Sequence, residues 1–171
     1  MRETYEGRLC ANLQLFFTSA FSLQPLAFLP VSCKDAKIDA LVAAHRGREL
    51  DAHYLAYFDC FNRQLYFEAH EVLEAIWLPV RGGGEDRFYR GLIQLAGAFV
   101  HLQKQRFGPA GALFRLAQSN LSRYPATHHN LNVSDVLEII SRWLSRVEAA
   151  ALGQSMSGWE SSAPTLSPMQ E

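Results

Sequence analysis

The stretch from Tyr66 to His101 decides the fold. It reads YFEAHEVLEAIWLPV (66–80), then RGGG (81–84), then EDRFYRGLIQLAGAFVH (85–101). Both long segments carry apolar residues around much of a helical circumference, which is typical of buried α-helices. The glycine-rich break between them predicts a short flexible connection. We therefore expect two adjacent antiparallel helices at the centre of a bundle.

Helical periodicity continues on both sides of this central pair, and no segment shows the alternation of a strand. Residues 1–33 form a poorly patterned N-terminal extension, and the Ser/Pro-rich residues 153–171 predict a disordered tail. The sequence thus predicts an all-α fold, a single compact bundle of about six helices over residues 34–152. The helices outside the central pair are expected over about 35–47, 49–62 and 109–123, and from a Ser134 cap through Val147.

Composition excludes several classes of function. The chain has 171 residues, is 49% hydrophobic and has a formal net charge of -1. It offers no field of one sign for nucleic acid or an anionic membrane, so neither partner is expected. Polar residues and prolines interrupt the apolar run over residues 9–31, which argues against a membrane-spanning helix. Three scattered cysteines, Cys10, Cys33 and Cys60, favour a reducing compartment, and we expect a cytoplasmic location.

Each central helix carries a stripe of residues that an apolar core normally excludes. Positions three, four and seven residues apart share one helical face, so the two stripes could face each other across the pair. Gly91 and Gly97 each cost about 1 kcal/mol relative to alanine inside a helix, which suggests close approach by another backbone or a ligand. The stripe consists of His70, Glu71 and Glu74 on the first helix and Arg90, Gln94 and His101 on the second.

One interpretation of the stripe is a metal site. Imidazoles and carboxylates suit a divalent transition metal such as zinc, iron or manganese. His70, Glu74 and His101 would then be the metal ligands, and Glu71 would be the general base of a catalytic site. The spacing matches neither the zinc-protease nor the di-iron pattern, and a nearby arginine would repel a cation.

Two other interpretations stay open. Arg90 could clamp the carboxylate or phosphate of a small ligand while Gln94 orients it. Alternatively, the stripe is a closed internal network in which Arg90 pairs with Glu71 or Glu74 and fixes one packing of the helices. His128 and His129 fall in a polar loop and are assigned no role.

The motifs of the central pair resemble the domain of unknown function 309 family, whose members are small all-helical proteins. The resemblance rests on FEAHE-x-x-E-x-x-W (67–77), GLIQ-x-A-x-x-x-x-H (91–101) and GALFRLAQSNL (111–121), and extends over about residues 50–147. Many relatives have glycine where this chain has Gln64. The resemblance implies the helical fold and the presence of the polar stripe, and it implies no activity.

For function, the sequence favours a non-catalytic binding or structural module with a small-molecule or protein partner. The alternative is a metal-dependent, hydrolase-like enzyme that uses the His/Glu cluster. The two classes differ in one structural respect, because a catalytic pocket needs an open mouth and convergent geometry, and a structural network needs neither.

Overall fold

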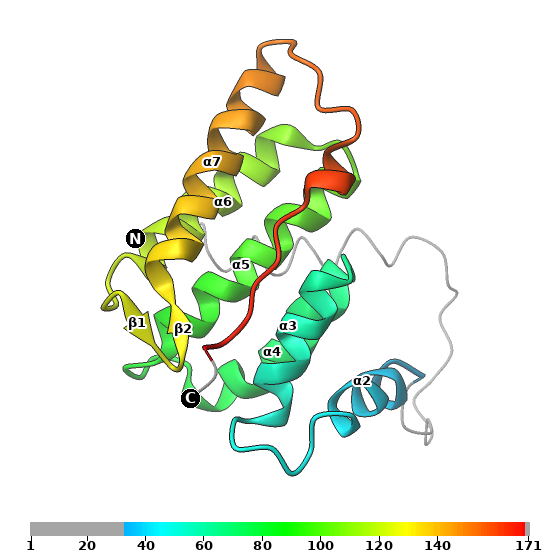
Figure 1. Cartoon of the computed structure of the whole chain (residues 1–171), viewed down its shortest axis with the longest axis vertical. Coiled ribbons are helices and arrows are strands. Elements are labelled where there is room, and N and C mark those ends of the chain that lie inside the picture. Colours follow the sequence, from blue (N-terminus) through cyan, green and yellow to red (C-terminus); the bar gives the residue numbers. More distant parts are fainter. Residues whose placement is uncertain (1–32, 170–171) are drawn as a thin grey trace, which may run out of the picture. The chain divides into compact units, whose positions relative to one another are not determined.

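The computed structural model describes residues 33–169, and this part of the chain is an all-α bundle (Figure 1). The predicted fold of about six helices is confirmed, with a small hairpin and a short 3₁₀ helix in addition. The elements are α2 (Cys33–Ala43), α3 (Ala52–Asn62), α4 (Tyr66–Val80), α5 (Asp86–Gln103), α6 (Phe107–Leu121), β1 (Thr127–His128), β2 (Leu131–Asn132), α7 (Val133–Ala151) and η1 (Trp159–Ser162).

The turn from α3 to α4 determines how the FEAHE helix enters the bundle. Asp51 caps the start of α3, because its side chain accepts hydrogen bonds from the backbone N–H groups of His53 and Tyr54, at 2.8 and 3.2 Å. At the other end of α3, Gln64 adopts a left-handed backbone with φ 58°. Glycine occupies such positions most readily.

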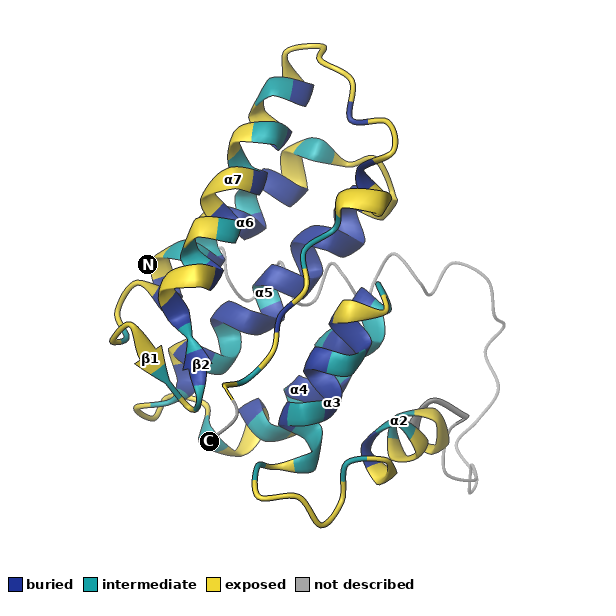
Figure 2. Cartoon of the chain, in the orientation of Figure 1, coloured by how far each residue is buried: buried dark blue, intermediate teal, exposed yellow. Residues whose placement is uncertain are grey.

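Helix α5 is the central helix of the bundle, and most of its length is buried (Figure 2). It packs against α4 on one side and α6 on the other. The sequence analysis expected a backbone or a ligand close to Gly91, but a Cβ there would lie 2.7 Å from Leu121 Cγ of α6. The neighbour is thus a side chain of this bundle, with the Ala117 carbonyl oxygen behind it at 3.5 Å.

A two-residue hairpin precedes α7, although the sequence shows no strand signal. Thr127 pairs with Asn132 and His128 with Leu131 in antiparallel register. His129 and Asn130 form the turn with φ values of 47° and 54°, the left-handed backbone that the tightest hairpins require. Strands of two residues are too short for an alternating pattern, so periodicity could not predict them.

The segment after α7 is ordered through residue 169, which corrects the prediction of a disordered tail over 153–171. Trp159 is 4% exposed and packs against Tyr66, Phe99 and Trp143, with ring centroids 6.5, 6.1 and 5.7 Å away. Figure 1 shows this segment turning back along the bundle. The Ser/Pro-rich composition also contains Trp159, and burial of this large side chain helps to offset the ordering entropy of the segment.

Two side-chain hydrogen bonds hold the end of the tail on α3. The Asn62 amide donates to the Leu166 carbonyl oxygen and accepts from the Leu166 N–H, both at 2.7 Å.

The predicted extension over residues 1–33 lies outside the described residues, apart from Cys33 at the start of α2. In the described part of the chain, every helix falls short of the length and apolar character that crossing a membrane requires.

Candidate functional site

Three of the six predicted site residues come together on the second and third turns of α4. One ligand atom from each of His70, Glu71 and Glu74 lies within 4.8 Å of the other two. His70 Nδ1 is 3.4 Å from Glu71 Oε1, and these side chains are 13% and 8% exposed. The helical spacing of i, i+1 and i+4 produces this group locally, so the sequence was sufficient to predict it. We call these three residues the α4 cluster.

The imidazole of His70 is oriented by packing. Its ring lies nearly parallel to that of Phe67, at a centroid distance of 6.5 Å and an angle of 12°. His70 Nδ1 is buried, and no described group forms a hydrogen bond with it. A buried polar nitrogen normally has a partner, so this atom has the character of a ligand-binding position.

Arg90 has a different partner from those the sequence suggested. It pairs with Asp86, one turn earlier on α5, a partner that the sequence did not suggest. Asp86 also accepts a 2.6 Å hydrogen bond from Trp77 Nε1, and the Arg90 guanidinium lies 5.8 Å from the Trp77 ring centroid. Partial burial raises the pKa of Asp86, but the hydrogen bonds from Trp77 and Arg90 and the charge of Arg90 lower it overall. Asp86 thus joins α4 to α5, a role that sequence reasoning missed.

Gln94 is used in the contact between α5 and α6. Its side-chain oxygen accepts a 2.8 Å hydrogen bond from Asn120 Nδ2, and Asn120 Oδ1 accepts one from Arg87 at 3.3 Å. Asn120 is 3% exposed, so the pair is an internal link between two helices. These contacts form an internal network whose members Asn120 and Arg87 were not part of the network that the sequence analysis left open.

His101 is buried near the end of α5 and does not join the α4 cluster. Burial lowers its pKa below the ordinary value for histidine, and the charges of Arg106 and Lys104 lower it further. A neutral imidazole in this position fits the protein interior. The geometry therefore supports His101 as a packed histidine and separates it from its predicted metal partners.

A second group of metal-ligand type includes the histidines to which the sequence gave no role. His128 Nε2 and His129 Nε2 lie 2.8 and 2.9 Å from the same carboxylate oxygen, Glu85 Oε2. Glu85 and the histidines are separated by more than 40 positions in the chain. The adjacent histidines were the only local signal, and spacing alone could not reveal their acidic partner.

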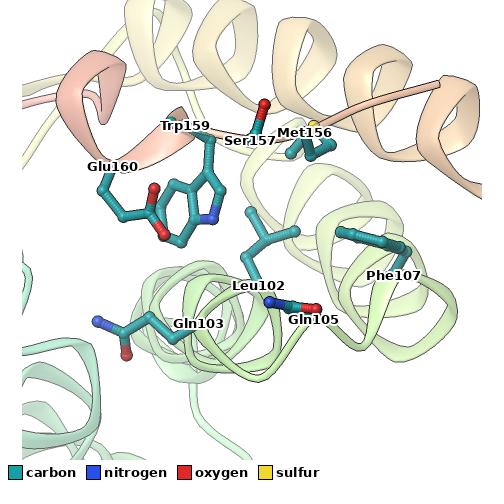
Figure 3. Close-up of a pocket in the computed structure, with 9 residues that line it drawn as sticks. Leu102, Gln103, Gln105, Phe107, Met156, Ser157, Trp159 and Glu160 are labelled. Atoms are coloured by element: carbon teal, nitrogen blue, oxygen red, sulfur yellow. The ribbon is translucent and has the colours of Figure 1, made fainter.

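A hollow of about 360 Å³ lies where the tail crosses the end of α5, and none of the six predicted site residues lines it. The indole of Trp159 and the carboxylate of Glu160 lie on one side, and Gln103 and Leu102 on the other (Figure 3). This hollow is therefore separate from the stripe that the sequence singled out.

Comparison with known proteins supports the fold and leaves the site to be argued from geometry. No curated protein and no solved structure matches the chain. One family model, described as "Domain of unknown function (DUF309)", matches residues 54–113. The matched segment contains the α4 cluster and all of α5, and it ends before Asn120, His128 and His129. Through this segment the predicted resemblance to the DUF309 family is confirmed.

Proposed function

We propose that this protein is a non-catalytic binding module whose α4 cluster holds a divalent transition metal ion. The proposal rests on one observation, the buried Nδ1 atom of His70 that lies beside two carboxylates without a hydrogen bond from any described group. A metal ion bound there would satisfy this nitrogen, with both carboxylates close enough to coordinate it. It would also tie successive turns of the FEAHE helix to a single centre.

The donor set suits a metal of the zinc, iron or manganese class. Imidazole nitrogen favours zinc and iron, and carboxylate oxygens extend the range to manganese. The carboxylates of Glu71 and Glu74 would neutralise the charge of a divalent ion. Because the side chain of Glu71 is only 8% exposed, its interaction with the ion would be weakly screened by solvent.

The surrounding contacts favour binding over catalysis. The residues expected to hold a substrate, Arg90 and Gln94, are engaged with Asp86 and Asn120 in the internal network. Glu71, the predicted general base, is itself a member of the ligand group. A base that coordinates the ion is not available in the same way for proton transfer.

One feature supports the alternative, a metal-dependent hydrolase. Three protein ligands leave a coordination position for water, as catalytic zinc sites do. In that case the loaded protein should hydrolyse an activated ester or phosphate, and the activity should disappear when His70 is replaced. A non-catalytic module should bind the ion and show no turnover.

The test is metal binding by the full-length chain, measured by calorimetry and metal analysis after chelator treatment. His70→Gln should lose one bound ion per chain while its circular dichroism spectrum remains helical. His101→Gln is the matched control, because it removes an equally buried histidine that lies outside the α4 cluster. The proposal fails if His70→Gln binds as many ions as the parent. Loss of an ion in His101→Gln would instead support the ligand set predicted from the sequence, which is His70, Glu74 and His101.

A further inference from the structure

The hairpin before α7 brings two consecutive histidines to one carboxylate. His128 Nε2 and His129 Nε2 lie 2.8 and 2.9 Å from Glu85 Oε2. Glu85 stands at the N-cap of α5, and its side chain makes no capping hydrogen bond there. Its carboxylate is therefore directed to the hairpin, and the three residues form a compact group of two imidazoles and one acid, which we call the hairpin cluster.

Consecutive residues of a regular strand point to opposite faces, so two adjacent histidines would normally diverge. Here His129 leaves the strand conformation and adopts φ 47°. Backbone of this kind costs a residue other than glycine about 1–2 kcal/mol. The left-handed turn is thus what allows both imidazoles to reach the same oxygen, and strain of this kind is often found at functional sites.

Aromatic rings hold both imidazoles in place. The ring centroids of Phe88 and Tyr124 lie 4.8 and 4.7 Å from that of His128, and the Tyr89 centroid lies 5.7 Å from that of His129. The Tyr54 hydroxyl donates a 3.0 Å hydrogen bond to the His129 carbonyl oxygen. The ligand atoms are consequently pre-organised by residues of α3 and α5, which lowers the entropic cost of binding.

We propose that Glu85, His128 and His129 form a zinc-binding site that fastens the hairpin to the start of α5. Two imidazoles and one carboxylate are a donor set that zinc uses, with one position left for water. Ligand atoms around a tetrahedral zinc ion lie about 3.3 Å apart, given bond lengths of about 2.0–2.2 Å. The two Nε2–Oε2 separations need to widen by only about half an ångström to admit the ion, and the side chains are exposed enough to move.

The charge of the group also suits a cation. Glu85 supplies a carboxylate, which carries one negative charge at neutral pH. Neutral imidazoles with free Nε2 lone pairs can face the ion once it replaces their protons. The hairpin cluster shares no residue with the α4 cluster, and two of its members lie outside the DUF309 segment, so each site can be tested without the other.

The experiment titrates chelator-treated full-length His70→Gln protein with Zn²⁺, so that ions at the α4 cluster do not contribute. We expect one ion to bind and the melting temperature to rise with zinc concentration, because the ion binds the folded state. Adding His129→Asn should weaken binding by at least tenfold, about the effect of disturbing a metal's outer shell. Asparagine tolerates the left-handed backbone at this position, so the hairpin should remain folded. Glu85→Gln should weaken binding to a similar extent, and His53→Gln, which removes a more distant histidine, should leave it unchanged.

A second measurement does not depend on any variant. In NMR spectra of the histidine rings, Zn²⁺ should shift the signals of His128 and His129 and leave that of His53 in place. Equal zinc affinity in the His129→Asn and Glu85→Gln variants, or ring signals that do not respond to zinc, would overturn the proposal. Failure of the α4 site would give a different result, because the single variant His70→Gln would then bind as many ions as the parent protein.

Discussion

Replacing Gly91 with alanine tests the packing of the central helix most directly. A Cβ at this position would lie 2.7 Å from Leu121 Cγ and 2.9 Å from Leu121 Cδ2. Leu121 is fully buried, and its Cγ is not the free end of a flexible chain, so it cannot easily withdraw. The clash should cost about 1–3 kcal/mol, as overpacking of a core does.

Alanine also gains about 1 kcal/mol of helix propensity over glycine, and this gain partly hides the clash. Two other helical glycines supply the reference. At Gly111 the nearest atom to a Cβ is Val147 Cγ1 at 3.5 Å, an ordinary contact, so Gly111→Ala should stabilise the protein by nearly the full propensity gain. At Gly97 the distance to Leu113 Cδ1 is 3.2 Å, and Gly97→Ala should be close to neutral.

The free energy of unfolding would be measured for each variant by urea denaturation. Gly91→Ala should be less stable than Gly111→Ala by about 1–3 kcal/mol, because the propensity gain cancels between them. Combining Gly91→Ala with Leu121→Ala should show favourable coupling of at least about 0.5 kcal/mol, since the smaller residue makes room. If Gly91→Ala stabilises as much as Gly111→Ala, the close approach of α5 and α6 is not as described.

Three further substitutions test other contacts. Asp86→Ala should cost about 3–5 kcal/mol in urea denaturation, because it removes the buried carboxylate that accepts hydrogen bonds from the Trp77 N–H and the Arg90 guanidinium. Trp159→Ala should cost about 3–5 kcal/mol and make the tail sensitive to limited proteolysis, because the buried indole anchors that segment. Because burial and the nearby positive charges lower the pKa of His101, protons bind the unfolded chain more tightly. The contribution of neutral His101 to the free energy of unfolding should be complete above about pH 6.5 and should decrease as the pH falls from there through the lowered pKa. His101→Gln should remove this loss, and His53→Gln should not.

The sequence predicted what depends on neighbouring positions. Apolar residues at intervals of three and four gave the helices, and the same spacing placed His70, Glu71 and Glu74 in one group on α4. In each case a single helix carries the information, so the period of 3.6 residues was enough.

Contacts between distant segments could not be predicted in this way. Arg90 pairs with Asp86, one turn earlier on α5, and the stripe argument did not consider this residue. The tail looked disordered by composition, although Trp159 and the Asn62–Leu166 hydrogen bonds fix it on the bundle. Such pairings depend on the path of the chain in three dimensions, which periodicity does not describe.

Glu85 and Asp86 are adjacent at the start of α5, and their side chains make contacts with two different parts of the chain. The glycine-rich connection delivers Glu85 and Asp86 to the N-terminus of a helix, where negative charge is favourable. Successive positions of a helix point about 100° apart, so Asp86 turns inward to Trp77 while Glu85 turns to the hairpin histidines. Asp86 is buried and should matter to stability whether or not metal is bound. Glu85 is 39% exposed, and without an ion its pairs should contribute less than about 1 kcal/mol, so its effect on stability should depend on zinc.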